Sequence, residues 1–285
     1  MTLNNRYEFV MLFDVENGNP NGDPDAGNMP RVDAETSIGI VTDVCLKRKI
    51  RNYVEATQMG KPGYNILIKN DRALNTKYTE AYKTCGLKTG EKGKNQSAVE
   101  KARDYICKNY FDVRTFGAVM STGDDPCGIV RGPVQINFAR SIDPVLPQEI
   151  TITRQALTTE KDKENKENTM GKKTFIPYGL YRAEGYISAL LAQKTGFSEE
   201  DLELLWESII NMFEIDHSAA RGKLCMRKLY VFKHASALGN APSHLLFDKI
   251  TVTRKDDVDV ARNFSDYTIS IDRDMPEGVS LIEKL

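Results

Sequence analysis

The segment from Tyr7 to Val15 (YEFVMLFDV) constrains the fold more than any other part of this chain, because it is almost continuously apolar. Aromatic and β-branched residues without polar alternation are typical of a strand that is buried on both faces. We therefore predict that this segment is a central strand. With 285 residues, the chain is long enough to build one large domain, or a smaller domain with sizeable insertions, around it.

A loop rich in turn-forming residues follows the strand, with the sequence ENGNPNGDPD at residues 16–25. Asn, Gly, Pro and Asp hold the backbone in fixed turns and point amides and short polar side chains outward. Asn19 and Asn21 are the candidate contacts, because a side-chain amide can donate to phosphate or ribose oxygens without carrying a charge. The alternative is a structural turn cluster whose Asn side chains satisfy the local backbone.

A basic helix is predicted after this loop. Asp33 or Thr36 can cap its beginning, and the helical composition ends near Ala56. The helix carries the sequence LKRKIR at residues 46–51. Together, the loop and the helix suggest a grip on a nucleic-acid backbone.

The cations of this helix are spaced so that several can meet one ligand. At 100° per residue, Lys47, Arg48 and Arg51 fall within about one 100° arc, whereas Lys49 points elsewhere. A run of Lys and Arg on a helix is usually a solvated face, but this run follows the loop directly and can border the same groove. We therefore predict that Lys47, Arg48 and Arg51 touch phosphates.

The rest of the chain is predicted to alternate between helices and strands. Helical composition is found at residues 74–84 and 97–110 and after Ser198, where Asp201 approximates a capping-box partner. Strands are predicted at residues 7–15, 64–68, 129–140, 226–234, 250–254 and 267–272, and residues 175–179 and 181–191 are expected to be strand or extended structure. Residues 160–173 hold nine charged residues in 14, and such a stretch is expected to form a flexible, protruding loop.

These elements predict an α+β fold. Their order is strand, helix, insertion, strand, protrusion, strand, helix, strand, which is the β-α-β-β-α-β frame of an RRM-like (ferredoxin-like) domain. Residues 1–57 would form the first part of the frame, 58–128 a mostly helical insertion, and 129–285 the rest.

Composition excludes several classes of protein. A net charge of −1 and an isoelectric point near 6.4 argue against coating nucleic acid through a global field, but not against a local basic groove. No run approaches the roughly 18 apolar residues of a membrane helix, and no signal peptide is apparent, so a cytoplasmic protein is expected. Five cysteines without a CxxC pair favour reduced thiols over a disulfide frame or zinc site. No cofactor is predicted.

The segment DVRTFG at residues 112–117 ends the insertion with a cation, an aromatic residue and a glycine. Arg114 can bind a phosphate and Phe116 can stack a base. The equally weighted alternative places Phe116 in the core and Arg114 in a salt bridge. Aromatic patterns typical of RNA-binding RRM sheets are absent, so binding on the sheet face is not expected.

The acids of the first loop leave an enzymatic alternative open. Asp14, Glu16, Asp23, Asp25 and Asp33 are enough carboxylates for a metal site in principle. Their spacing matches no metal-binding loop, including the EF-hand, and acids in Pro/Gly loops are mostly turn formers. A metal-dependent ribonuclease using Asp25 or Asp33 therefore remains the minor alternative, and no metal site is predicted.

Several segments taken together resemble a known family. They are RYEFVMLFDVENGNPNGDPD with PRVD and LKRKIR, then DVRTFG, FIPYGLYRAEGYISALL, and DHSAARG before KLYVFKHASALGNAP. This combination resembles the type I-C CRISPR backbone subunits, the Csd-two branch of the Cas-seven superfamily. The resemblance runs from residue 6 to beyond residue 250.

The resemblance implies a hand-shaped protein with an RRM-like palm, a helical insertion and a thumb inserted at about 140–175. Copies would polymerise along a CRISPR guide RNA in a helical Cascade complex with other Cascade subunits. The guide would pair with target DNA, and the subunit itself would not be a nuclease. Asn19, Asn21, Lys47, Arg48 and Arg51 would then line the palm.

At the thumb, Met170, flanked by Lys172 and Lys173, would be an apolar wedge at a kink in the guide. The alternative is that Met170 packs on a neighbouring subunit. Related type III subunits cleave RNA with a loop Asp, but no motif match transfers that role to Asp25 or Asp33.

Overall fold

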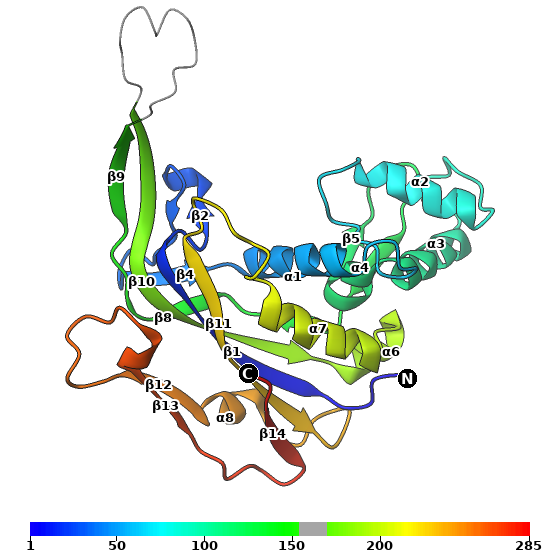
Figure 1. The fold of residues 1–285 in the computed structure, drawn as a ribbon. Coiled ribbons are helices and arrows are strands. Elements are labelled where there is room, and N and C mark those ends of the chain that lie inside the picture. The colour runs from blue at the N-terminus through cyan, green and yellow to red at the C-terminus, as the bar shows by residue number, and fades with distance from the viewer. Residues whose placement is uncertain (154–169) are drawn as a thin grey trace, which may run out of the picture.

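The computed structural model describes residues 1–153 and 170–285. A large antiparallel sheet dominates it, with hydrogen-bonded neighbours in the order β14-β11-β1-β10-β8-β4 and with β7 and β9 also paired to β10 (Figure 1). These strands are β1 (Tyr7–Gly18), β4 (Ile38–Val41), β7 (Val134–Ile136), β8 (Ala139–Pro144), β9 (Gln148–Thr153), β10 (Met170–Ile187), β11 (Lys223–His234) and β14 (Val279–Glu283).

β1 lies between β10 and β11, and residues 7–15 are all buried, which confirms the predicted central strand. Phe9 and Phe13 belong to the hydrophobic core on one face, whereas Val10 and Leu12 belong to a second core on the other face. Side chains of a strand alternate between its two faces. Because both faces are covered, the sequence of β1 shows no polar alternation.

Helices cover one face of the sheet and the C-terminal segment covers the other. The first core includes apolar residues of α1 (Asp43–Thr57) and α7 (Glu199–Asn211). The second core includes residues of α8 (Ser243–Phe247), β12 (Ile250–Arg254) and β13 (Tyr267–Ile271). The sheet therefore has no open face at β1, and a ligand has to be bound at its edges or by the loops.

The predicted start of the basic helix is wrong. The carboxylate of Asp33 accepts hydrogen bonds from the backbone N–H groups of Glu35 and Thr36, but these close a turn rather than begin a helix. Residues 38–41 then form β4, which pairs with β8. α1 begins only at Asp43, where the Thr42 side chain accepts from the N–H of Cys45.

The insertion contains the two predicted helices, α2 (Leu74–Thr84) and α3 (Gln96–Asn109). A short helix, α4 (Phe111–Phe116), and a hairpin of β5 (Gly117–Met120) and β6 (Gly128–Arg131) complete it. The segment has its own hydrophobic core, separate from those of the sheet. No helix in the described residues combines the length and the apolar character that a membrane crossing needs.

Two strand predictions need correction. Residues 64–68 form no strand, and only an isolated bridge joins Asn65 to Tyr110. The predicted strand at 129–140 is divided into β6, β7 and β8: Gly132 and Pro133 separate β6 from β7, and residues 137–138 separate β7 from β8. Val134 and Ile136 are buried in the core, whereas Phe138 is 54% exposed.

The protrusion is a hairpin of β9 and the first part of β10, which projects beyond the sheet (Figure 1). Its register pairs Thr153 with Met170 and Gln148 with Phe175. Lys172 and Lys173 therefore lie in a strand and not in the predicted loop. The remainder of that predicted loop, residues 160–169, lies outside the described residues.

Candidate nucleic-acid interface

A groove of about 390 Å³ lies between the first loop and α1. The turn that precedes β11 supplies its third wall through Asp216 and Arg221. Four of its lining residues are cationic and one is a carboxylate: the residues are Asn21, Arg31, Thr42, Val44, Cys45, Arg48, Lys49, Asn52, Asp216 and Arg221. The loop and the basic helix thus border one groove, as the sequence predicts.

The loop is held in shape by short-range pairing. Residues 22–23 pair with residues 29–30 as a small antiparallel ladder, and a 3-10 turn at Pro24–Ala26 joins them. Asn19 is 2% exposed and its side-chain amide donates to the carbonyl of Asn28 at 2.7 Å. Its backbone N–H donates to the carbonyl of Ala220 at 2.9 Å. Asn19 therefore stabilises the loop that borders the groove and does not line the groove itself.

Asn21 joins the loop to the beginning of α1. Its side-chain oxygen accepts from both the N–H and the hydroxyl of Thr42, each at 2.9 Å. Its amide nitrogen has only a long contact, 3.4 Å, to the carbonyl of Gly22. The oxygen of Asn21 is thus engaged, and the amide N–H groups remain the part that can donate to a ligand.

Three arginines carry the charge of the groove. Arg48 donates to the carbonyl of Ile68 at 2.6 Å, and Arg221 donates to the carbonyl of Pro20 at 3.2 Å. Arg31 lies 3.4 Å from Asp23, and its Nε is buried with no hydrogen-bond partner in the described residues. Because Arg48 donates to a neutral carbonyl, much of its positive charge stays uncompensated, whereas Arg221 also lies near the carboxylate of Asp216. Burial and the nearby Arg51 lower the pKa of Arg48.

Lys49 differs from these arginines. Its ammonium group contacts the carboxylate of Asp216, and its side chain is 3% exposed. Burial lowers the pKa of Lys49 to about 8. Arg221 also faces Asp216, with 3.6 Å between Nε and the carboxylate. The single acid of the groove is therefore held mainly by Lys49.

Lys47 and Arg51 do share a helix face with Arg48, but that face meets the insertion. Lys47 pairs with Asp43 at 2.9 Å, and Arg51 pairs with the fully buried Asp112 at 2.9 Å. Both cations lie over the ring of Phe116, at 5.8 and 5.1 Å from its centroid. These two side chains attach α1 to α4.

Arg114 and Phe116 are placed as the structural alternative describes, with Arg114 in a salt bridge and Phe116 in the core. Arg114 is 6% exposed, and its guanidinium binds both carboxylate oxygens of Asp201, at 2.9 and 2.7 Å. Its guanidinium also lies over the rings of Tyr64 and Phe111, at 5.1 and 5.5 Å from their centroids. Phe116 is 7% exposed and belongs to the sheet's first core. In this conformation neither side chain can reach a ligand in the groove.

The hairpin stands beside the groove loop, because the hydroxyl of Thr174 donates to the carbonyl of Asn28 at 3.3 Å. Lys172 is exposed and pairs with Glu149 at 2.7 Å, while Lys173 is half-buried. Exposed Ile150 faces Lys173 in the register. The side chain of Met170 lies outside the described residues, so its predicted wedge has no structural counterpart here.

The loop carboxylates act within the loop. The Asp33 carboxylate accepts the two backbone N–H groups that close its turn, and these bonds lower its pKa. The carboxylate of Asp23 accepts from the N–H of Asp25 at 3.1 Å. Among the described residues, no group of three or more His, Cys, Asp or Glu side chains is placed to hold a metal ion. No observation in this region favours the ribonuclease alternative.

Sequence reasoning missed Arg31 and Arg221. Both lie within segments that carry the family resemblance, PRVD and DHSAARG. Arg221 is distant from the loop in sequence, and only the pairing of β1 with β11 brings it there. For Arg221, the available signal in the sequence was an isolated arginine next to a glycine, just before a strongly predicted strand.

Comparisons with known proteins agree with the fold. A family model described as "CRISPR-associated protein Cas7" matches residues 5–272. A protein of Haloferax volcanii with the same description is 28% identical over 255 residues, covering 81% of this chain and 71% of the relative. A chain of a solved "CRISPR RNA-guided surveillance complex, pre-nicking" superimposes with a TM-score of 0.54 at 12% identity, covering 80% of this chain and 78% of that one. At that identity, the likeness concerns the fold alone.

Proposed function

Because the chain belongs to the Cas7 family of CRISPR-associated proteins, we propose that it is a guide-RNA-binding backbone subunit of a type I-C surveillance complex in antiviral defence. Several copies would assemble along one CRISPR RNA together with other subunits of the complex. The guide would be held by its backbone, so that its bases stay free to pair with target DNA. The role is binding and positioning, without catalysis.

The observation that carries the proposal is the arginine-lined groove between the first loop and α1. Arg31, Arg48 and Arg221 come from three separate segments and line one space with the amide of Asn21. The planar guanidinium matches phosphate geometry, and backbone contacts supply most of the affinity for nucleic acid irrespective of sequence. A local groove of this kind agrees with a net charge near zero.

The arrangement of the sheet supports an RRM-like palm. The order β11-β1-β10-β8, with α1 and α7 on one face, corresponds to the predicted β-α-β-β-α-β frame. We propose residues 1–57 and 129–285 as the palm, with residues 58–128 as its insertion. The segment at about 140–175, which contains the β9–β10 hairpin, would be the thumb that closes over the guide.

The candidate residues then divide into two groups. Asn21, Arg31, Arg48, Arg221, Lys172 and Lys173 are proposed as RNA contacts. The buried or ion-paired residues Asn19, Lys47, Arg51, Arg114 and Phe116 are proposed to stabilise the fold without touching the RNA. Met170, the first residue of β10, remains proposed as an apolar wedge at a kink in the guide.

The experiment is the salt dependence of RNA affinity. Arg48→Gln and Arg221→Gln are each expected to weaken binding of a single-stranded guide RNA about 10- to 100-fold, because a hydrogen bond to a charged group is worth roughly 1.5–3 kcal/mol. Each is also expected to reduce the slope of log affinity against log salt by about 0.7.

Matched controls are Lys83→Gln and Lys94→Gln, which remove exposed cations of the insertion, away from the groove. These variants should keep the affinity and the slope of the parent chain. Groove variants that bind RNA as well as the controls do would disprove the assigned site.

A further inference from the structure

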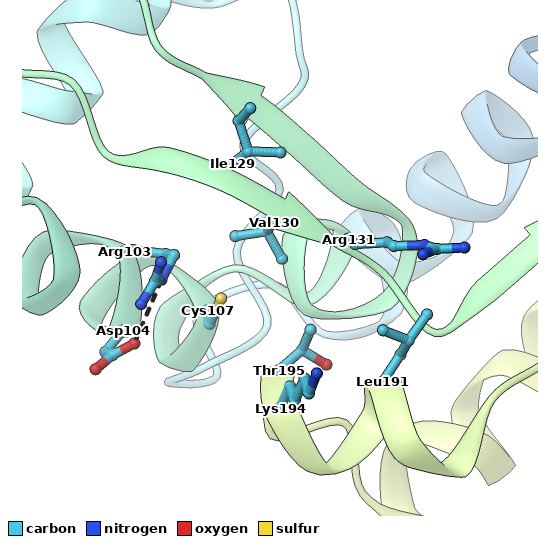
Figure 2. Close-up of a pocket in the computed structure, with 9 residues that line it drawn as sticks. All are labelled: Arg103, Asp104, Cys107, Ile129, Val130, Arg131, Leu191, Lys194 and Thr195. Atoms are coloured by element: carbon cyan, nitrogen blue, oxygen red, sulfur yellow. Dashed lines mark ion pairs between the residues drawn. The ribbon is translucent and has the colours of Figure 1, made fainter.

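A second pocket, of about 500 Å³, lies between α3, β6 and α6 (Ala189–Thr195). Figure 2 shows Arg103 on α3, Arg131 at the end of β6 and Lys194 on α6, so each of these elements contributes one cation. Its volume is within the range of about 300–1,000 Å³ that is usual for binding pockets. It is separate from the arginine groove and shares no lining residue with it.

Two of the three cations of this pocket lack a partner among the described residues. Arg131 and Lys194 are exposed, and neither forms an ion pair or hydrogen bond through its side chain within the described residues. Arg103 lies 3.8 Å from Asp104, which is itself largely exposed. Three cations therefore face one carboxylate, and the pocket favours an acidic occupant.

An apolar ridge adjoins these cations. Ile129 on β6 is 62% exposed, and Val119, its partner in the β5–β6 register, is 72% exposed. Leu191 of α6 adds a further apolar side chain to the lining. A phosphate chain would gain little from such a ridge, whereas an acidic peptide segment with an aliphatic side chain fits both features.

The chain itself carries such a segment at its other end. Residues 255–260 (KDDVDV) connect β12 to the turn at Phe264–Asp266. Asp256, Asp257 and Asp259 are exposed, and none has a side-chain ion pair or hydrogen bond in the part of the chain that the structure describes. Val260 beside them is 60% exposed.

This acidic loop and the basic pocket lie far apart in one molecule. In Figure 1 the loop after β12 is at the left edge, whereas α3, β5 and α6 are at the right. The loop therefore cannot fill the pocket of its own chain without rearrangement of the fold. Two complementary patches at opposite ends suit a head-to-tail contact, which repeats along an open assembly.

We propose that the acidic loop of one copy, residues 255–260, docks into the basic pocket of the next copy. Asp257 and Asp259 would meet Arg131 and Lys194, and Val260 would cover Ile129. This inference rests on the proposed function in one respect, the assembly of several copies, and it adds the surfaces through which they meet. The contact is too small to hold two copies alone, so guide RNA or further contacts have to add to it.

The test uses opposite charge reversals in the full chain. A pocket variant carries Arg131→Glu and Lys194→Glu, and a loop variant carries Asp257→Lys and Asp259→Lys. Sedimentation velocity with guide-length RNA is expected to show loss of multimers for each variant alone. An equimolar mixture of the two variants should assemble again in alternation, because the acidic loop of the pocket variant fits the basic pocket of the loop variant, and the reversed loop of the latter fits the reversed pocket of the former. A chain with all four reversals should assemble again.

The control variant, Lys83→Glu with Lys94→Glu, makes the same charge change on the insertion and should assemble as the parent does. A carbodiimide cross-link between Lys194 and Asp257 or Asp259 of another copy provides a readout on the unaltered protein. Multimers that persist in both reversal variants, or recovery that fails in the fourfold chain, would overturn the proposal.

Short RNA that binds a single copy separates the alternatives. If the pocket variant loses affinity for it and the loop variant does not, the pocket is an RNA site and the proposal is wrong. If the parent chain binds no RNA but still assembles with the expected charge dependence, the proposed function fails and the contact stands. If the parent chain binds RNA as a multimer and reversal of these four charges leaves assembly unchanged, the proposed contact fails and the proposed function stands.

Discussion

The buried pair of Arg114 and Asp201 is predicted to hold the insertion on the sheet domain, and its removal should be costly. The guanidinium donates to both oxygens of Asp201 and also to the carbonyl of Gly63. The side chains are 7% and 4% exposed. Arg114→Ala leaves a buried carboxylate without its counter-charge, and breaking such a pair typically costs about 3–5 kcal/mol.

Denaturant unfolding monitored by circular dichroism measures this cost. The control is Arg72→Ala, which removes a partner of Glu80 from an ion pair whose side chains are about half exposed, and should cost less than about 1 kcal/mol. Arg114→Met combined with Asp201→Asn should be less destabilising than the sum of the single changes, by about 1–3 kcal/mol.

The Arg114→Ala variant also distinguishes a structural role of Arg114 from a role in RNA binding. RNA affinity per folded molecule should stay within about twofold of the parent, because Arg114 does not reach the groove. An unfolding free energy within about 1 kcal/mol of the parent, together with lost RNA affinity, would refute the assignment.

Three further outcomes are expected. At pH 8, Cys107 and Cys127 should react with iodoacetamide about 100-fold and about 1,000-fold more slowly, respectively, than half-buried Cys85. Burial raises the pKa of Cys107 to about 11 and that of Cys127 to about 12, which lowers their thiolate fractions; equal rates by peptide mass spectrometry would contradict their burial. Thr42→Ala should lower the free energy of unfolding in urea by about 1–2 kcal/mol, since it removes the cap of α1 and a hydrogen bond to the loop. Thr42→Ser should restore most of that free energy. Gly18→Ala should cost about 1–3 kcal/mol in thermal unfolding, because the new methyl group would collide with the backbone beside Gly222; an unchanged midpoint would argue against that close approach.

Local patterns in the sequence were sufficient for the elements that build the sheet domain. The apolar run at residues 7–15 predicts a strand buried on both faces, and β1 is one. Ser198 and Asp201 predict the beginning of α7, where both halves of the capping box are formed. Each of these signals lies within a few residues of the structure that it specifies, so no long-range contact was needed to interpret it.

Predictions that depended on distant partners were less successful. Asp33 has the chemistry of a helix cap, but pairing of residues 38–41 with β8 makes that stretch a strand. The helical arc correctly groups Lys47, Arg48 and Arg51, yet Asp112, 61 residues after Arg51, decides that this face meets the insertion. Arg221 enters the groove only through the pairing of β1 with β11. A single sequence contains no record of such contacts.

The central claim is that the chain binds a CRISPR guide RNA, and the RNA that co-purifies with it tests this most directly. The full chain would be expressed with a CRISPR array, purified, and its bound RNA sized and sequenced. The account predicts RNA of discrete length, made of repeat-derived and spacer sequence, and its loss when Arg31, Arg48 and Arg221 are all replaced by Gln. Protein free of RNA, or carrying only random cellular fragments while the guide is present, would contradict it.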